Sequence, residues 1–300
     1  CSVTSFNGAQ FRQYPVDQII REFKRVPEDL ILIVDDNLIG TRWKHIERAK
    51  DLFRAMIQAD IKKNWVAQTT INIAKDTELL ELAATAGCKG LFIGFESPSP
   101  DGLKEMEGKN KLCRSEDLGK AVRRIQAFGI LVAGSFIIGF DTDKPGIGKR
   151  IADTADRYGV DFVNVLFLTP LPGTRLWEDL DFQNRITICE FPENWKYYTL
   201  TYPVVRYKNL TTDEAIAEMN LCSKRFYTLP KILRRLWLNM RHRQSLVIGL
   251  AGGLSYRKNI RIECTKLGDF SSRINGMHGE EENRDVQLTN PACTNFGYRN

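Results

Sequence analysis

Residues 90–97 read GLFIGFES, and residues 131–141 read LVAGSFIIGFD. Each stretch is a short run of apolar residues that stops at a polar one. Runs of this length, rich in β-branched and aromatic residues, predict strands. Because the apolar residues occupy consecutive rather than alternate positions, we expect both faces of each strand to be buried, as is typical of a parallel sheet.

The same pattern repeats on either side of these two runs. It predicts further strands at residues 30–34, 65–71 and 162–168, and helices at residues 15–26, 41–59, 76–86, 115–128 and 145–158. Thr41 and Ser115 are typical of helix N-caps, and Gly87 and Gly129 of helix ends. Strands that alternate with helices in this way predict right-handed crossovers in an open sheet or a barrel.

Polar residues follow nearly every predicted strand, whereas no glycine-rich phosphate loop does. The missing loop argues against a dinucleotide-binding open sheet. In a barrel, the carboxyl ends of the strands meet at one mouth, where active sites of this architecture lie. We therefore predict an α/β fold, a partial (β/α) barrel of the TIM type, with a site at that mouth.

The pattern changes after residue 180. A loop-rich stretch over residues 181–210 precedes Thr211 and Glu214, which are spaced as a capping box. Helices are expected to continue to about residue 250, with breaks at Pro230 and around Arg243. The last stretch lacks periodicity, which predicts a poorly ordered tail. The predicted division is a barrel over 1–182, a helical accessory domain over 183–262 and a tail over 263–300.

The composition is that of a globular protein, with 43% hydrophobic and 27% charged residues in 300, which excludes a disordered or fibrous chain. The longest uncharged apolar stretch, residues 245–255, is too short to span a bilayer. Seven cysteines are an odd number, and no signal peptide is recognisable at the start. These features favour a cytoplasmic location.

Positive charge is concentrated near the C-terminus. Residues 220–261 contain ten Lys or Arg and no Asp or Glu, in a chain of net charge +6. Within this segment, residues 229–243 have apolar side chains at helical spacing with arginines partly opposite. Such a helix either packs on the barrel with a solvated cationic face or makes peripheral contact with an anionic membrane. No nucleic-acid-binding module accompanies the charge, so nucleic acid is not expected as a partner.

Several motifs together resemble one enzyme superfamily. They are CSVTSFNGAQFR at 1–12, VDDN at 34–37, GLFIGFES at 90–97, GSFIIGF at 134–140 and LTPLPGT at 168–174. This set resembles the radical S-adenosylmethionine (SAM) superfamily, and within it the cobalamin-binding branch that contains the hopanoid methylases and the anaerobic magnesium-protoporphyrin ester cyclases.

The resemblance implies a 4Fe-4S cluster held by three cysteines spaced C-x3-C-x2-C, since three soft thiolates leave one iron open for SAM. Cys1 matches the third cysteine of that motif. The other two cysteines, the first barrel strand and the cobalamin-binding domain are expected upstream, so the chain is expected to be a fragment that is inactive alone. None of the other six cysteines has the required spacing.

The resemblance also assigns SAM contacts to the strand ends. Asp35, Asp36 and Asn37 lie where the family binds the amino group of the methionine moiety, because carboxylates and amides accept hydrogen bonds from an ammonium. The alternative is a solvated Asx turn. Glu96 and Ser97 correspond to positions that contact the ribose or the carboxylate. Two further candidates, expected to point to the same side of a strand, are Gln68 and Asn72. Any of these polar groups could equally be satisfied by its neighbours.

A third group of positions resembles the adenine-binding segment. Ser135 stands where its pattern has the first Gly, while Ile137 and Gly139 match the pattern, and Gly139 is expected to let a flat ligand approach the backbone. Thr142 stands where the family has Glu, and Asp141 or Asp143 is a possible substitute. Residues Leu168, Thr169 and Pro170 are expected along the adenine edge, although Pro170 could simply stiffen a turn.

The function that the resemblance implies is reductive cleavage of SAM to a 5'-deoxyadenosyl radical, with cobalamin-dependent methyl transfer to an unactivated carbon. Radical cyclisation or rearrangement is the alternative within the superfamily. Two other hypotheses are a scaffold without cluster chemistry and an ordinary barrel enzyme that uses Asp35, Asp36 and Glu96 as catalytic carboxylates. The implied partners are a small-molecule or lipid-like substrate and a reductant such as flavodoxin or ferredoxin.

Overall fold

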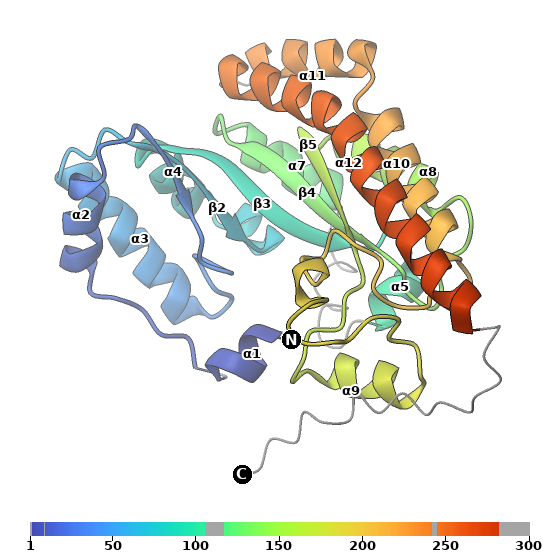
Figure 1. Ribbon diagram of the computed structural model, residues 1–300. Helices are drawn as coiled ribbons and strands as arrows, with labels where there is room; N and C mark the ends of the chain where they lie inside the picture. Colours follow the sequence, from blue (N-terminus) through green and yellow to red (C-terminus); the bar gives the residue numbers. More distant parts are fainter. Residues whose placement is uncertain (1, 9, 106–116, 242–244, 282–300) are drawn as a thin grey trace.

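The computed structural model describes residues 2–8, 10–105, 117–241 and 245–281 (Figure 1). Its strands are β1 (Leu30–Ile33), β2 (Asn64–Thr69), β3 (Cys88–Glu96), β4 (Leu131–Ile138) and β5 (Phe162–Phe167). Its α-helices are α1 (Ser2–Asn7), α2 (Val16–Arg25), α3 (Trp43–Gln58), α4 (Thr77–Thr85), α5 (Pro100–Glu105), α7 (Leu118–Gln126), α8 (Ile147–Tyr158), α9 (Arg175–Phe182), α10 (Thr212–Phe226), α11 (Leu229–Arg241) and α12 (Leu246–Glu281). Two short 3₁₀-helices are η1 (Ile71–Lys75) and η2 (Trp195–Tyr197).

The five strands form one sheet in the order β1-β2-β3-β4-β5, and all four neighbouring pairs are parallel. Sequential order in a parallel sheet requires every crossover to run in the same direction, which curls the sheet toward a barrel. The sheet remains open between β1 and β5, and the helical segment α10–α12 follows it (Figure 1). The predicted α/β partial barrel is therefore confirmed.

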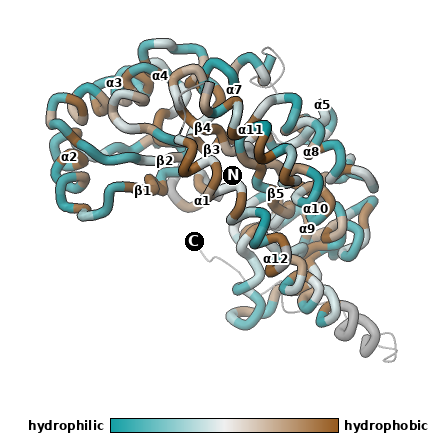
Figure 2. Tube along the Cα trace, turned by 90° about the horizontal axis from the view of Figure 1, so that it is seen from above, coloured by the Kyte–Doolittle hydropathy of each residue, from teal (hydrophilic) through white to brown (hydrophobic). Residues whose placement is uncertain are grey.

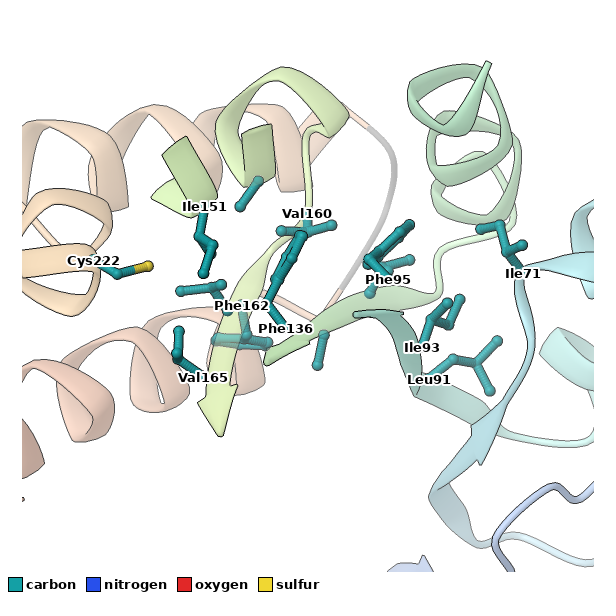
Figure 3. Close-up of a cluster of buried hydrophobic side chains, with 14 of the residues drawn as sticks. Ile71, Leu91, Ile93, Phe95, Phe136, Ile151, Val160, Phe162, Val165 and Cys222 are labelled. Atoms are coloured by element: carbon teal, nitrogen blue, oxygen red, sulfur yellow. The ribbon is translucent and has the colours of Figure 1, made fainter. Parts of the chain in front are cut away.

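The core lies between one face of this sheet and the helices of the crossovers. Ile93, Phe95 and Phe136 are almost fully buried there, and the rings of Phe95 and Phe136 stack with centroids 5.6 Å apart. Figure 3 shows these side chains gathered with Ile151 of α8. The hydrophobic segments of the strands occupy the middle of the molecule, and the more hydrophilic turns of the helices surround them (Figure 2).

Helix starts follow local capping chemistry. The predicted capping box is confirmed, because the Thr211 hydroxyl accepts from the Glu214 N–H and the Glu214 carboxylate accepts from the Thr211 N–H. The prediction for Thr41 is wrong, since α3 begins two residues later with Arg42 in the cap position and no side-chain cap. Ser115 lies outside the described residues, and the Asp117 side chain caps α7 instead.

The free edge of β5 is covered by the helical segment. The Tyr227 hydroxyl accepts from the Val163 N–H at 2.9 Å and donates to the Val163 carbonyl at 2.8 Å. Farther along β5, the Phe167 N–H donates to the Leu200 carbonyl at 2.8 Å. These bonds replace the partners that a sixth strand would supply. The domain boundary expected at residue 182 stays a prediction.

Helix α12 continues to Glu281, so the predicted poorly ordered tail is wrong over residues 263–281. Leu267, Phe270 and Ile274 fall at helical spacing and are buried. The Phe270 ring packs between the rings of Tyr197 and Tyr202, at centroid distances of 5.0 and 5.1 Å. Tertiary packing thus stabilises this helix. Its few apolar residues are separated by many polar ones, which is why the sequence pattern did not predict it. Residues 282–300 lie outside the described residues.

None of the helices in the described ranges is long and apolar enough to cross a membrane.

Candidate functional site

The carboxyl ends of all five strands lie along one edge of the sheet, as parallel pairing requires. Residues paired across neighbouring strands share a face. Gly94 pairs with Ser135, and Ser135 pairs with Asn164. Gln68 pairs with Phe92 on the same face, and Ile137 pairs with Leu166. This inner face, opposite the helix-covered core, therefore brings predicted residues Gln68, Ser135 and Ile137 together.

The end of β3 carries the most unusual backbone of the site. Glu96 has φ +67°, and the Ser97 N–H donates to the Phe95 carbonyl at 2.8 Å, which closes a three-residue turn around Glu96. The pairing with β4 is irregular between Gly94 and Glu96. A turn of this hand is rare for a residue with a side chain and costs about 1–3 kcal/mol. Such strain is typical of functional sites, and here it occurs at a glutamate residue that is only 7% exposed.

Ser97 has a structural partner. Its hydroxyl accepts from the Ser99 N–H at 3.2 Å, and it lies so close to Gly102 that a Cβ there would meet the Ser97 Oγ at 2.3 Å. Ser97 therefore shapes the turn into α5. Its predicted contact with a ribose or carboxylate stays untested.

At the end of β1, Asp35 and Asp36 are exposed and Asn37 is half-buried. The Asn37 carboxamide oxygen accepts from the Gly40 N–H at 3.0 Å and lies 3.5 Å from the Thr69 hydroxyl. The Asn37 side chain thus bonds the backbone of its own loop, at the N–H three residues later, and the predicted contact of these residues with an amino group stays a prediction. Asn37 therefore ties the loop to β2, while the two carboxylates remain accessible at the rim.

The end of β2 differs from the sequence prediction. The strand stops at Thr69, so Asn72 lies in η1 and does not continue the side-chain alternation that was expected to align it with Gln68. Gln68 itself is exposed on the inner face. Within the described ranges, the buried atoms Thr70 Oγ1 and Asn72 Oδ1 have no hydrogen-bond partner. An unpaired buried polar atom is costly and marks a place where a ligand can supply the partner.

Gly139, at the end of β4, serves packing rather than ligand approach. Its φ is +116°, and a Cβ there would lie 2.3 Å from the Tyr207 ring, so the flat group next to Gly139 is Tyr207. The Asp143 carboxylate accepts from the N–H groups of Gly139 and Phe140 at 2.9 and 3.1 Å. Burial raises the pKa of Asp143 to about 6. Asp141 pairs with Arg185 at 2.7 Å. Both Asp residues are thus engaged by the protein.

The end of β5 is held by hydrogen bonds to two backbone carbonyls. The Leu168 N–H donates to the Ile138 carbonyl at 2.8 Å, and the Thr169 hydroxyl donates to the Phe167 carbonyl at 3.0 Å. Pro170 is buried and Leu168 is half-buried. These bonds hold Leu168 and Thr169 at the end of β5, and the predicted contact of Leu168, Thr169 and Pro170 with an adenine edge stays a prediction.

Sequence reasoning missed Thr70, Gly94 and Asn164. Gly94 is exposed on the inner face, between β2 and β4, where it leaves room for a ligand against the backbone. Asn164 lines a cavity of about 240 Å³ between β5 and α12, together with Tyr202, Tyr256 and Glu263. No local sequence pattern marks Gly94 or Asn164, because it is the pairing of the strands that places both beside Ser135.

Metal ligands are not assembled within the described ranges, which hold no group of three or more His, Cys, Asp or Glu able to bind a metal. Cys1, the predicted cluster ligand, lies outside them. Cys88 and Cys222 are free and buried. Burial raises the pKa of both thiols, that of Cys222 to about 12, which disfavours the thiolate that a cluster needs.

Comparison with known proteins identifies curated relatives but no matching family model. The chain is 27% identical to the hopanoid C-2 methylase of Rhodopseudomonas palustris over 239 residues, covering 78% of this chain and 43% of the relative. It is 27% identical to the bacteriochlorophyllide d C-12(1)-methyltransferase of Chlorobaculum tepidum over 243 residues, covering 79% and 50%. The predicted resemblance to the branch that contains the hopanoid methylases is confirmed.

The chain spans about half the length of the curated relatives it matches. Among solved structures, it is similar to the radical SAM methyltransferase TsrM from Kitasatospora setae with cobalamin and a 4Fe-4S cluster bound. That match has a TM-score of 0.47 and 18% identity and covers 56% of this chain and 33% of TsrM. The fold assignment rests on the order and pairing of β1 to β5.

Proposed function

We propose that this chain supplies the SAM-binding half-barrel of a radical SAM methyltransferase, with SAM seated on the inner face at the strand ends. Relatives that are methyltransferases, similar over more than three quarters of the chain, support this assignment. The observation that carries it is Glu96, a buried carboxylate held in a strained turn at the end of the central strand.

The donor set fits SAM in chemical type. Glu96 offers carboxylate oxygens that suit the paired hydroxyls of a ribose. Gln68 adds an exposed carboxamide on the inner face, and Thr70 and Asn72 add buried oxygen atoms that have no partner in the part of the chain described. Asp35 and Asp36 provide anionic groups at the rim for an ammonium. The apolar Ile137, beside Leu166, suits the face of an adenine.

A 4Fe-4S cluster and cobalamin would supply the one-electron reduction and the methyl carrier that this chemistry needs. In the proposal Cys1 is the ligand that this chain contributes to the cluster, and the other ligands and cobalamin come from outside the 300 residues. The chain's own role is to orient SAM through the strand ends and to exclude water with the segment that covers β5.

The proposed substrate is a small, lipid-like molecule with an unactivated carbon, and the proposed electron donor is a flavodoxin or ferredoxin. Support for the substrate class comes from the relatives' names, which refer to hopanoids and a bacteriochlorophyllide. The cavity between β5 and α12 has aromatic and apolar walls and, in addition, polar or charged groups that include Asn164, Glu263 and Lys266, a mixture that can hold and orient such a molecule.

The test is anaerobic reconstitution of the full-length protein with iron and sulfide. We expect a brown chromophore and, with a reductant, conversion of SAM to methionine. Asp36→Ala and Glu96→Ala are expected to weaken SAM binding without changing the iron content. A colourless protein that is indifferent to oxygen would support an ordinary barrel enzyme instead.

A further inference from the structure

Helices α11 and α12 expose an unusual number of large apolar side chains. Those at least 40% exposed on α11 and over residues 246–254 of α12 are Leu229, Leu233, Trp237 and Met240 on α11, and Leu246, Val247, Leu250 and Leu254 on α12. At about 100° of rotation per residue, each set falls within an arc of about 100° and so forms one stripe along its helix. We call these eight residues the apolar surface.

The two stripes lie on the same side of the helix pair. Asn239 of α11 lies against Gly249 of α12, and Ile232 lies against Gly253, so the two helices run antiparallel. Each residue of an α-helix is rotated by about 100° about the helix axis from the one before it. When this angle is counted from the N- to the C-terminus, the exposed stripe of each helix lies about a quarter turn beyond the residues that contact the other helix. In antiparallel helices that rotation carries both stripes to the same side. The apolar surface is therefore continuous across the pair.

Cations border this surface. A pocket of about 490 Å³ is lined by Lys224, Arg257 and Lys258 together with Leu254, which itself belongs to the apolar surface. The exposed Arg234 lies on α11, on the far flank of its stripe. No acidic residue occurs anywhere from residue 220 to residue 261. Apolar side chains, a tryptophan and a pocket lined by cations therefore occur together on this side of the molecule.

We propose that the apolar surface and its cationic pocket dock the protein on an anionic phospholipid membrane. The apolar side chains and Trp237 would enter the headgroup region, and Lys224, Arg257 and Lys258 would bind lipid phosphates. Charge complementarity favours this occupant over a second copy of the chain, because a symmetric dimer would place the same cations against one another.

This docking surface is independent of the SAM site. The first turns of α12 pack at the start of β5, where a Cβ on Gly252 would lie 2.7 Å from the Phe162 ring. Figure 1 shows α11 at the opposite end of the sheet from α9, which follows the carboxyl end of β5. A docked protein would thus hold the strand ends away from the bilayer, so docking recruits the protein rather than closing its site.

The experiment is sedimentation of the protein with vesicles of phosphatidylcholine alone and of phosphatidylcholine with 30% phosphatidylglycerol, at low and high salt. We expect at least tenfold stronger partitioning onto the anionic vesicles at low salt, and a marked decrease at high salt. Leu233→Glu/Trp237→Glu and Lys224→Glu/Lys258→Glu are each expected to reduce partitioning by about tenfold or more.

The controls introduce glutamate in place of exposed apolar or basic residues on other surfaces. Phe182→Glu replaces a residue of α9 that is 90% exposed, and Lys44→Glu/Lys62→Glu changes two exposed lysines far from α11. These controls should keep partitioning within twofold of the wild type, and all variants should keep the wild-type melting temperature.

Equal partitioning by wild type and both α11–α12 variants would overturn the proposal. So would a dimer that Leu233→Glu/Trp237→Glu dissociates, or binding to duplex DNA that exceeds vesicle binding and survives that substitution. Because none of these measurements uses iron or SAM, the docking proposal and the proposed function fail separately.

Discussion

The two ends of the sheet are built differently. At the β5 end, Tyr227 and Leu200 satisfy the edge of the strand, and α12 packs beside it. At the β1 end, Leu32 and Val34 are 57% and 78% exposed, and Gln68 on the neighbouring strand is exposed as well. The β5 end is closed by the protein's own groups, whereas the inner face near β1 and β2 is open to a ligand.

Because the two ends are built differently, the closed end should matter mainly for stability and the open end mainly for ligand binding. Groups at the closed end are buried and hydrogen-bonded, so their loss should destabilise the fold. Groups at the open end contribute little burial, so their substitution should alter binding far more than stability. Glu96 lies between the two ends and combines burial with backbone strain.

The largest effect is expected for Tyr227→Phe. It removes both bonds of the Tyr227 hydroxyl and leaves the N–H and carbonyl of Val163 unpaired and buried, which should lower the free energy of unfolding by about 2–4 kcal/mol. Denaturant titration measures this change. Tyr14→Phe, at a residue that is 70% exposed, is the control and should have no measurable effect. If the two variants had the same free energy of unfolding, the Tyr227 hydroxyl would not stabilise the edge of β5 as described.

The second effect depends on pH and concerns Asp143. Its pKa is raised by burial from 3.8 to about 6, so the folded state binds more protons than the unfolded state between those values. Stability contributed by the protonated group is present below pH 3.8 and is lost as the pH rises through 6, by about 2–3 kcal/mol in total.

Asp143→Asn keeps an oxygen that can accept the two N–H groups but cannot ionise. Denaturant titrations at pH 4.5 and pH 7.5 should therefore show this variant gaining stability relative to the wild type at the higher pH. If the free energies of unfolding of wild type and variant differ by the same amount at both pH values, Asp143 does not titrate in this way.

The third effect separates strain from function at Glu96. Glu96→Gly relieves the positive φ and should raise the free energy of unfolding by about 1 kcal/mol, while it abolishes the proposed SAM contact. The same substitution at Glu81, an exposed residue within α4, should instead cost about 1 kcal/mol. Destabilisation of similar size in both variants would remove the argument from strain.

The smallest effect is expected at the open end. Leu32→Ser should change the free energy of unfolding by less than about 0.5 kcal/mol, because most of the side chain is already in contact with water. Val165→Ser, at a β5 residue that is 9% exposed, is the comparison and should cost about 2 kcal/mol. A large loss for Leu32→Ser would mean that the β1 end is also closed.

The sequence predicted the parts of the fold that depend on local patterns. Apolar runs located all five strands, polar residues marked their ends, and Thr211 with Glu214 specified a helix start. What it missed depends on contacts between distant residues. Gly139 is required by Tyr207, which lies 68 residues later, and α12 extends past residue 262 because Phe270 packs against Tyr197.

The candidate site was predictable in position but not in detail. Glu96 and Gln68 lie where the strand ends indicated, but the early end of β2 moves Asn72 into a 3₁₀-helix. Pairing register, which periodicity does not specify, is what places Gly94 and Asn164 beside Ser135.

The most direct test of the strand-end site is the affinity of SAM for anaerobically reconstituted, iron-matched wild type, Glu96→Gln and Glu81→Gln. Glutamine at position 96 keeps the shape but removes the charge, so SAM should bind at least tenfold more weakly, about 1.4 kcal/mol. Glu81→Gln, on α4, should bind SAM as the wild type does. Unchanged affinity in Glu96→Gln would contradict the assignment of the site.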